Sequence, residues 1–390
     1  MPPAPLIVLV AGEASGDALG AALIEALKRR HPEARFAGIG GPRMRDAGFD
    51  AWWDIAELSV MGLGEVLRHL PRLLGLRRRL AERIIASQPA VVIGIDAPDF
   101  NLGLEQRLRA AGLSTIHYVS PTVWAWRSGR AERIGRSASL VLCLFPFEPA
   151  FYAGHGVAAR YTGHPLADSI PMDQPQAPAR QTMGLPAQAS VVALLPGSRG
   201  SEVSRLSAPM LDAALELARR HPGMRFVAAM ASAQVRGLFE AELARRPGLD
   251  CLLLDGQAQQ AMVAADVVVC ASGTATLECL LVKRPMVVVY RVSALTAVLA
   301  RSLRLIKSRF VSLPNVLAGE ALVPELLQEE VTGPNIAAAV DAWLADVEGR
   351  QRLHQRFVEL HGSLRCQAAD TAAAEVTAFL GRQGHAPHAA

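Results

Sequence analysis

The stretch VVALLPGSRGSEVS, residues 191–204, decides the fold class of this chain. Five apolar residues predict a buried strand over 191–195, and a helical pattern begins near Glu202 after only a short turn. A strand that is apolar throughout and leads directly into a helix is typical of a parallel sheet covered by helices on both faces. The turn itself, Pro196 to Gly200, contains an arginine, which a tight turn does not need and a phosphate-binding turn does.

The same alternation of short apolar runs and longer helical patterns continues on both sides of this stretch. Strands are predicted over 6–12, 34–40, 91–96, 114–120 and 139–145 in the first half, and over 191–197, 225–231, 251–256, 267–272 and 285–291 in the second. Two such series predict an α/β protein with two doubly wound, Rossmann-like domains. The carboxyl ends of both sheets are expected to face one cleft, which is where such sheets bind ligands.

Composition also predicts the domain boundaries. Four prolines and little periodicity over 167–189 indicate a linker between an N-terminal domain, 1–166, and a C-terminal domain, 190–333. Residues 334–390 are expected to form C-terminal helices with a frayed end. One option is that these helices pack back on the N-terminal domain.

The overall composition excludes several classes of protein. The 390 residues are 51% hydrophobic and only 19% charged, which indicates a well-buried globular protein. A formal net charge of +4 is small for this length, so no nucleic-acid partner is expected. Five scattered cysteines without a C-x-x-C pair favour reduced thiols in the cytosol. Without a signal-peptide pattern or an apolar run of roughly 20 residues, we expect a soluble or peripherally attached protein.

Two turns in the second domain have the composition of phosphate-binding turns. One follows the strand at 191–195, and the other, ASGT, follows the strand at 267–271. Backbone N–H groups at the start of a helix bind anions, and the fork of an arginine guanidinium matches phosphate oxygens. Glu278, one turn into the second helix, is placed to accept hydrogen bonds from a ribose diol. The candidate nucleotide ligands are Gly197, Ser198, Arg199, Ser272, Gly273, Thr274 and Glu278.

Both turns also admit a purely structural interpretation. The first is then a strand-to-helix turn with a surface arginine, and in the second Ser272 or Thr274 caps the helix while Glu278 is solvated. Two such turns in one domain nevertheless favour a nucleotide diphosphate. The sequence has no Walker A lysine motif and no G-x-G-x-x-G after its first strand, which disfavours ATP hydrolysis and dehydrogenase chemistry.

Small residues and carboxylates follow two strands of the first domain. In VAGEASGD, Gly12 and Gly16 permit a close backbone approach, and Ser15 is placed to cap the helix. In GIDAPDFN, Asp96 ends a buried strand, where a carboxylate can serve as a general base. We assign capping of the helix that begins near residue 101 to Asp99.

Two further segments combine apolar and basic residues. The loop YVSPTVWAWR, 118–127, carries Trp124 and Trp126, which either line a sugar or acyl pocket or form a hydrophobic plug. Residues 60–80 are a basic amphipathic segment, either packed on the sheet with a solvated basic face or resting on an anionic membrane. The residues assigned to a membrane surface are Leu67, Arg68, Leu70, Arg72, Leu74 and Arg78.

Eight motifs taken together carry a family resemblance. In order they are VAGEASGD, GGPRM, VMGLGEVL, GIDAPDFN, HYVSPTVWAWR, LPGSRGSEV, ASGTATLEC and SLPNVLAG. This series resembles the motifs of the lipid-A-disaccharide synthase family, and the likeness extends from about residue 6 to about residue 380. The combination is far more specific than any single motif.

The resemblance implies an inverting glycosyltransferase with the two-domain glycosyltransferase-B fold. It implies transfer of 2,3-diacylglucosamine from its UDP derivative to 2,3-diacylglucosamine 1-phosphate, giving a β-1,6 disaccharide and UDP. By resemblance Asp96 is the base for the acceptor 6-hydroxyl, Arg199 a diphosphate ligand and Glu278 the ribose contact. Asn315, in another matching motif, joins the UDP ligands. The acceptor half contains Gly12, Glu13, Ser15, Gly16, Asp99, Trp124 and Trp126.

The acylated substrates favour the membrane-surface interpretation of residues 60–80. We expect a peripheral protein on the cytoplasmic face of the inner membrane of a Gram-negative bacterium. No aspartate-x-aspartate metal motif occurs, so we expect no metal or other cofactor, with Arg199 and helix N-termini stabilising the departing UDP. A homodimer is one option for the assembly.

Two other functions stay open at this point. Another UDP-sugar enzyme of the same fold, an N-acetylglucosaminyltransferase or a UDP-sugar 2-epimerase, would share UDP binding but not the acyl-chain surface. A non-catalytic nucleotide-binding membrane protein would bind UDP and tolerate the loss of Asp96.

Overall fold

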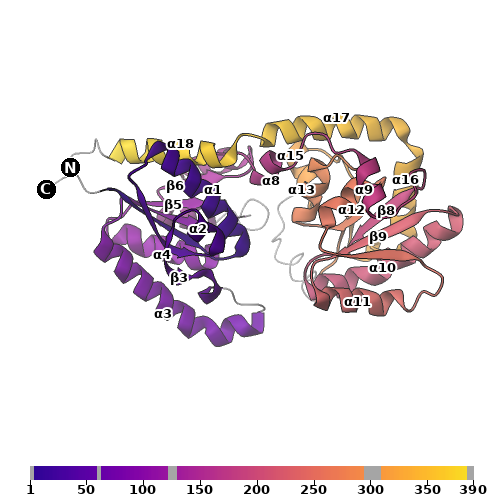
Figure 1. The fold of residues 1–390 in the computed structure, drawn as a ribbon, viewed down its shortest axis with the longest axis horizontal. Coiled ribbons are helices and arrows are strands. Elements are labelled where there is room, and N and C mark those ends of the chain that lie inside the picture. Colours follow the sequence, from indigo (N-terminus) through magenta and orange to yellow (C-terminus); the bar gives the residue numbers. More distant parts are fainter. Residues whose placement is uncertain (1–3, 59–62, 122–129, 294–308, 384–390) are drawn as a thin grey trace. The chain divides into compact units, whose positions relative to one another are not determined.

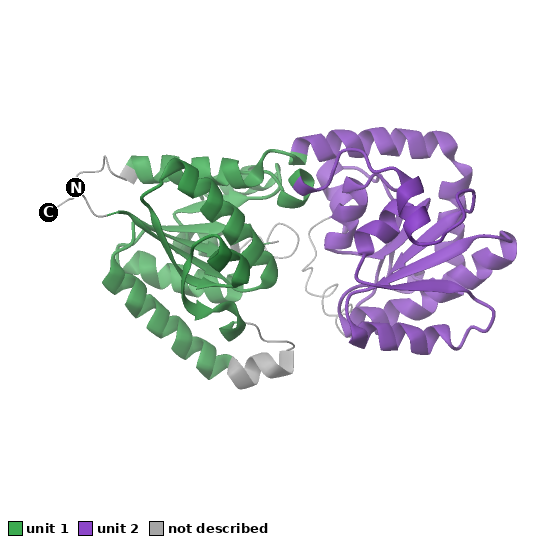
Figure 2. Ribbon diagram, in the orientation of Figure 1, with its two compact units in different colours: residues 1–168, 364–390 green, residues 169–363 purple. Residues whose placement is uncertain are grey.

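The computed structural model describes residues 4–58, 63–121, 130–293 and 309–383. Unit 1 contains residues 1–168 and 364–390, and unit 2 contains residues 169–363 (Figure 2). Each unit is a parallel sheet with helices on both of its faces (Figure 1). The α/β fold class expected from the alternating pattern is therefore confirmed.

Unit 1 has seven parallel strands in the order β3-β2-β1-β4-β5-β6-β7. The strands are β1 (Leu6–Ala11), β2 (Arg35–Gly40), β3 (Asp50–Asp54), β4 (Val91–Ile95), β5 (Thr115–Tyr118), β6 (Leu140–Cys143) and β7 (Ala159–Tyr161). The helices are α1 (Ala14–Arg30), α2 (Pro42–Asp46), η1 (Ile55–Glu57), α3 (Leu63–Ser87), α4 (Pro98–Ala110), α6 (Arg130–Ser137), α7 (Glu148–Ala153), α8 (Pro165–Ser169) and α18 (Ala368–Gln383). The direction of winding reverses between the paired strands β1 and β4.

Apolar side chains from strands and helices form the core of unit 1. β4 is buried along its whole length, as its continuous apolar run predicts. One cluster joins Val8 and Val10 of β1 with Leu76 and Leu80 of α3 and Leu104 of α4. Burying a side chain of this size contributes about 1.5–3 kcal/mol, so this cluster fixes α3 and α4 against the sheet.

Unit 2 has six parallel strands in the order β10-β9-β8-β11-β12-β13. The strands are β8 (Val191–Leu195), β9 (Arg225–Met230), β10 (Cys251–Asp255), β11 (Val267–Ala271), β12 (Met286–Tyr290) and β13 (Glu325–Leu327). The helices are α9 (Gln176–Thr182), α10 (Gly200–Arg220), α11 (Ala233–Leu243), α12 (Ala258–Ala264), α13 (Thr274–Leu281), α15 (Leu313–Ala318), η2 (Gln328–Glu330), α16 (Gly333–Ala345) and α17 (Val347–Leu364). The winding reverses between β8 and β11.

Helices α10 and α16 pack together in unit 2. Leu206 and Met210 of α10 and Ile336 and Val340 of α16 share one core cluster with Val269 of β11. These five side chains are at most 2% exposed. The start of α10 is therefore held rigidly at the end of β8, where the phosphate-type turn lies.

The segment 167–189 is part of unit 2 from residue 169 onward, and differs from the linker that its prolines predict. It contains Arg180, which is only 7% exposed. The guanidinium donates hydrogen bonds to the carbonyls of Ala264 (2.9 Å) and Ala187 (2.7 Å) and to the carboxylate of Asp266 (2.9 Å). These bonds attach the segment to unit 2, although the prolines interrupt its helical periodicity.

The C-terminal helices divide between the two units. α16 and α17 up to residue 363 belong to unit 2, and α18 packs on α1 of unit 1. Asp168 holds the start of α18, because its carboxylate accepts the N–H groups of Gln367 (2.9 Å) and Ala368 (2.6 Å). Of the residues from 334 onward, only those from Leu364 therefore belong with the N-terminal unit.

Candidate active site

Most of the residues predicted to bind nucleotide or acceptor follow the strands at which each sheet reverses its winding. These strands are β1 and β4 in unit 1, and β8 and β11 in unit 2. The chain leaves such a pair in opposite directions, so the loops at their carboxyl ends separate and leave room for a ligand.

Unit 2 has a cavity of about 430 Å³ at the carboxyl ends of β8 and β11. Seven of the eight residues predicted to bind nucleotide line this cavity: Gly197, Ser198, Arg199, Ser272, Gly273, Thr274 and Glu278. The strand ends add an apolar wall through Leu195, Ala229, Met230 and Ala271. A concave site with apolar walls and polar groups from two turns suits a small organic ligand with an anionic part.

The turn after β8 brings a cation to this cavity. Gly197 has a φ of +114°, and a Cβ there would lie 2.5 Å from a carboxylate oxygen of Glu202, so glycine is required. Arg199 is the N-cap residue of α10, and its guanidinium pairs with Glu202 at 2.8 Å. Because the Arg199 side chain is 78% exposed, exchanging this partner for an incoming anion costs little free energy. The sequence interpretation missed Glu202, although its position three residues after the N-cap is a capping-box signal.

The turn after β11 presents backbone N–H groups to the cavity. The N-cap residue of α13 is Gly273, and no side chain caps this helix. The Ser272 hydroxyl donates instead to the Val311 carbonyl at 2.7 Å. The capping alternative for Ser272 and Thr274 is therefore wrong. The first N–H groups of α13 remain at the positive end of the helix dipole, beside the cavity.

Glu278 lies on α13 and lines the same cavity. Burial raises the pKa of its carboxyl above the usual value, because desolvation disfavours the charged form. Among the described residues, no cation or hydrogen-bond donor stabilises this carboxylate. Its oxygens are therefore placed to accept hydrogen bonds from a ligand.

Asn315 does not line this cavity, contrary to the expectation from its motif. It is 1% exposed, and its amide nitrogen donates to the Val323 carbonyl and the Glu325 carboxylate, both at 2.9 Å. Its amide oxygen accepts the N–H groups of Leu322 (2.8 Å) and Val323 (2.9 Å). With its bonding capacity used internally, Asn315 shapes the loop between α15 and β13.

In unit 1, the turn after β1 touches the turn after β4. A Cβ on Gly12 would lie 2.5 Å from the Cβ of Ala97, so glycine permits this approach. Glu13 and Ser15 are exposed, and Gly16 is buried. The N-cap residue of α1 is Glu13, and Ser15 lies inside the helix without capping it, which corrects its expected role.

Asp96 follows β4 at this contact, in an unusual backbone conformation. Its φ is +51° and that of Ala97 is +44°, so two consecutive residues other than glycine are left-handed. Asp96 is half-buried, and no ion pair or hydrogen bond engages its carboxylate within the described part of the chain. Such backbone strain beside an unpaired carboxylate is a feature of functional sites.

Asp99 lies within the first turn of α4 and does not cap it. The N-cap residue is Ala97, without a side-chain hydrogen bond. The helix begins at Pro98, earlier than expected, because proline fits the first helical turn. The exposed carboxylate of Asp99 interacts favourably with the helix dipole, which is a weaker role than capping.

Four residues of the predicted membrane surface are described. Leu70 and Leu74, one helical turn apart on α3, are 44% and 45% exposed, and Arg72 and Arg78 are exposed as well. The side chains of Leu67, Arg68, Trp124 and Trp126 lie outside the described residues. None of the described helices has the length and apolar character needed to cross a membrane.

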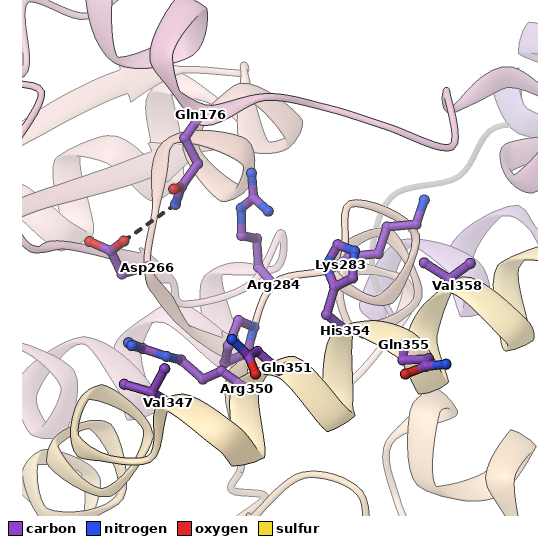
Figure 3. A pocket seen from close by; sticks show the side chains of 11 residues that line it. Gln176, Asp266, Lys283, Arg284, Val347, Arg350, Gln351, His354, Gln355 and Val358 are labelled. Carbon is purple, nitrogen blue, oxygen red and sulfur yellow. Dashed lines mark hydrogen bonds between the residues drawn. The ribbon is translucent and has the colours of Figure 1, made fainter.

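A second cavity of unit 2, of about 610 Å³, contains none of the predicted site residues (Figure 3). Its walls come from α17 and from Asp266 and Arg284, which precede β11 and β12. Arg284 donates to the carbonyls of Val263 (3.0 Å) and Gln174 (2.9 Å), so its charge stabilises the backbone. Nowhere in the described ranges do three or more histidine, cysteine, aspartate or glutamate side chains gather to hold a metal ion.

Two doubly wound units, the second with two phosphate-type turns in one cavity, define a protein of the glycosyltransferase-B class. The chain belongs to the lipid-A-disaccharide synthetase family, because the model of that family matches residues 7–376. The resemblance of the eight motifs is thereby confirmed, and with it the expected enzyme class, a glycosyltransferase.

Relatives agree with this family assignment, and solved structures agree with the fold. Lipid-A-disaccharide synthase of Xylella fastidiosa (strain 9a5c) is 50% identical over 97% of this chain and 98% of its own length. The lipid-A-disaccharide synthase of Xanthomonas campestris pv. campestris (strain 8004) is 52% identical over 97% of this chain and 86% of its own length. A putative UDP-N-acetylglucosamine 2-epimerase from Listeria monocytogenes has a TM-score of 0.65 at 12% identity, covering 99% of this chain and 97% of its own. The calicheamicin glycosyltransferase CalG4 has a TM-score of 0.61 at 17% identity, and the match covers 98% of this chain and 99% of CalG4. The two structures show the fold alone.

Proposed function

We propose that this chain transfers 2,3-diacylglucosamine from UDP-2,3-diacylglucosamine to the 6-hydroxyl of 2,3-diacylglucosamine 1-phosphate. The products are the β-1,6-linked disaccharide 1-phosphate and UDP. The observation that carries the proposal is the cavity of unit 2, where seven residues from two phosphate-type turns meet. Membership of the family supports the choice of substrates.

In this proposal unit 1 binds the acceptor and supplies one general base. Asp96 takes the proton of the 6-hydroxyl as the hydroxyl oxygen bonds to the anomeric carbon. The bond between that carbon and the UDP oxygen breaks, and its electron pair leaves with UDP. A single displacement from the opposite side inverts the anomeric configuration.

Unit 2, which binds the UDP donor in this proposal, stabilises the charge that develops on the departing diphosphate. The Arg199 guanidinium and the first N–H groups of α10 and α13 provide positive potential in the cavity. Glu278 accepts hydrogen bonds from the ribose hydroxyls in the same arrangement. The binding of UDP is therefore assigned to unit 2 and proton transfer to unit 1.

The proposal is tested by incubating the protein with both acylated sugars and determining product masses. We expect the disaccharide 1-phosphate and one UDP per disaccharide, and no UDP release without the acceptor. Incubation with UDP-N-acetylglucosamine alone serves as a control, and its epimerisation would favour the epimerase alternative. UDP binding without any product would favour a non-catalytic protein.

Arg199→Ala is expected to weaken UDP binding by roughly 1.5–3 kcal/mol, the range for a hydrogen bond to a charged group. Lysine at this position should restore the affinity only partly, because an ammonium lacks the planar fork that binds two phosphate oxygens. Titration calorimetry with UDP measures both variants. Arg205→Ala is the matched control, since Arg205 lies on the same helix outside the cavity and bonds the Ser201 carbonyl. Equal UDP affinity in the Arg199 and Arg205 variants would make the turn purely structural.

We also propose that the exposed part of α3 rests on the cytoplasmic face of the inner membrane, where acylated sugars reside. Replacing Leu70 and Leu74 together with serine should reduce co-sedimentation with anionic vesicles at every salt concentration, because apolar insertion is not screened. Replacing Arg72 and Arg78 with serine should reduce it mainly at low salt, at about 1 kcal/mol per arginine near the surface. Neither pair should change UDP affinity.

The same leucines separate membrane binding from packing against the sheet. Because Leu70 and Leu74 are exposed, their serine variants should unfold close to the wild-type temperature. Leu76 and Leu80, at 1% and 0% exposure on the same helix, are the controls, and polar substitution there should lower that temperature. A destabilised Leu70 variant that binds vesicles normally would assign α3 to packing alone.

A further inference from the structure

A buried polar cluster adjoins the turn that carries Asp96. Its members are Gly94 of β4, Asn101 and Glu105 of α4, and His117 of β5. The three polar side chains are each 0% exposed. Gly94 and His117 are paired in the register of β4 with β5, and α4 follows the turn directly. The polar cluster therefore belongs to the same strands and helix that place the candidate base.

Asn101 holds this turn through its amide nitrogen. Nδ2 lies 2.8 Å from the carbonyl oxygen of Asp96, 3.1 Å from that of Val10 and 3.3 Å from that of Ile95, and donates to all three. These contacts connect the end of β1 to the end of β4. The left-handed φ of +51° at Asp96 is unfavourable for a residue other than glycine, and these bonds offset that cost.

Glu105 and His117 complete the cluster around the Asn101 side chain. Glu105 lies one turn after Asn101 on α4, and its Oε1 is 2.7 Å from Nδ1 of His117. A Cβ on Gly94 would lie 2.1 Å from that Oε1 and 3.1 Å from Cγ of Asn101. The absence of a side chain at Gly94 therefore lets both polar groups of α4 lie directly against the strands.

Three atoms of the polar cluster are buried without a hydrogen-bond partner among the described residues. They are Oδ1 of Asn101, Oε2 of Glu105 and Nε2 of His117. Each such atom lowers the stability of the fold, because it loses its hydration without gaining a hydrogen bond, and apolar residues of equal volume often pack at lower cost. A cluster that is costly for folding and bonded to the turn of the candidate base points to a role in catalysis.

We propose that Asn101, Glu105 and His117 are positioning residues for Asp96. The bond between Glu105 and His117 fixes the carboxyl beside Asn101, and the Asn101 amide holds Asp96 in the conformation that directs its carboxylate. None of the three touches a substrate. The inference rests on the proposed role of Asp96 as general base and adds the residues that orient it. Displacing a reacting group by about 1 Å lowers a rate by about a hundredfold, so loss of this support is measurable.

Three variants test the polar cluster. Asn101→Asp keeps the shape of the side chain but places a hydrogen-bond acceptor against three carbonyl oxygens. His117→Leu removes the Nδ1 atom that bonds Glu105. His117→Asn places a polar atom near the position of that Nδ1 again. With both acylated sugars, the first two should lower kcat by about 10- to 100-fold, with KM and UDP affinity within about twofold of wild type. His117→Asn should recover most of the loss. Thr115→Val is the matched control, because this buried hydroxyl on the same strand bonds only the Ser137 carbonyl (2.8 Å) among described atoms, and its loss should affect stability but not kcat.

Double variants with Asp96→Asn distinguish positioning from general stability. If the cluster acts through Asp96, Asn101→Asp causes no further loss of kcat once the base is gone. Additive losses, or an equal fall of kcat in Thr115→Val and His117→Leu, would overturn the proposal. Wild-type kcat in the cluster variants beside an inactive Asp96→Asn would overturn it while leaving the base assignment in place. An active Asp96→Asn would instead refute the proposed role of Asp96.

Discussion

Asp96→Asn is expected to lower kcat for disaccharide formation by about two or more orders of magnitude, with UDP affinity unchanged. Asparagine keeps the size of the side chain and tolerates the left-handed backbone at this position, where φ is +51°. What the amide cannot do is accept the proton of the acceptor hydroxyl. Initial rates at saturating substrate concentrations measure the loss. UDP titration is an independent measurement, because Asp96 belongs to unit 1 and the nucleotide cavity to unit 2.

Asp99→Asn is the natural comparison for this experiment. Asp99 is a carboxylate three residues away, exposed in the first turn of α4, so its variant should lose far less activity than Asp96→Asn. A hundredfold loss at Asp99 with an active Asp96 variant would move the base to Asp99. Near-wild-type turnover in both variants would mean that neither carboxylate is the base.

The strands could be predicted where burial makes the whole run apolar. β4 and β8 are buried at all five positions, so nothing in their sequence alternates, and each appears as a continuous apolar run. The strands that the sequence did not predict are β3, β7 and β13, which all lie at sheet edges. These three strands lack a continuous apolar run, as the three half-buried residues of β13 illustrate, whereas β10, the remaining edge strand, keeps such a run and was predicted.

The candidate site could be predicted where it depends on backbone turns next to strands. Glycine and small residues after β8 and β11 are local features, and they gather in one cavity. Asn315, expected among the UDP ligands, instead bonds Val323 and Glu325, which lie across a loop that no local pattern reveals. Arg180 and Asp266 are 86 residues apart in the sequence, so their contact could not be predicted from a local pattern either. Without that contact, the prolines of the segment predicted a linker.

Removing the contact between Arg180 and Asp266 is expected to have a large effect on the stability of unit 2. Arg180→Ala is expected to destabilise unit 2 by roughly 1.5–3 kcal/mol, the range for hydrogen bonds to a charged group, because the Asp266 side chain that it leaves behind is 26% exposed. The Asp266 carboxylate would still accept hydrogen bonds from the N–H of Val191 (2.8 Å) and from the amide of Gln176 (3.3 Å, Figure 3). It would no longer be paired with the Arg180 guanidinium. The carbonyls that Arg180 now binds would lose their donor as well.

Arg245→Ala provides a control for the ion pair, because the distance between the charged groups is the same and the arginine is exposed instead of buried. The distance between nitrogen and oxygen is 2.9 Å in both the Arg180–Asp266 and the Arg245–Glu242 pairs, whereas the arginine side chains are 8% and 73% exposed. A solvent-exposed pair contributes at most about 1 kcal/mol, so Arg245→Ala should unfold near the wild-type temperature. Calorimetry with and without UDP identifies the transition of unit 2, since the ligand raises the unfolding temperature of the unit that binds it. If both variants unfold like wild type, the segment 167–189 contributes no stability to unit 2 and behaves as a linker despite its contacts.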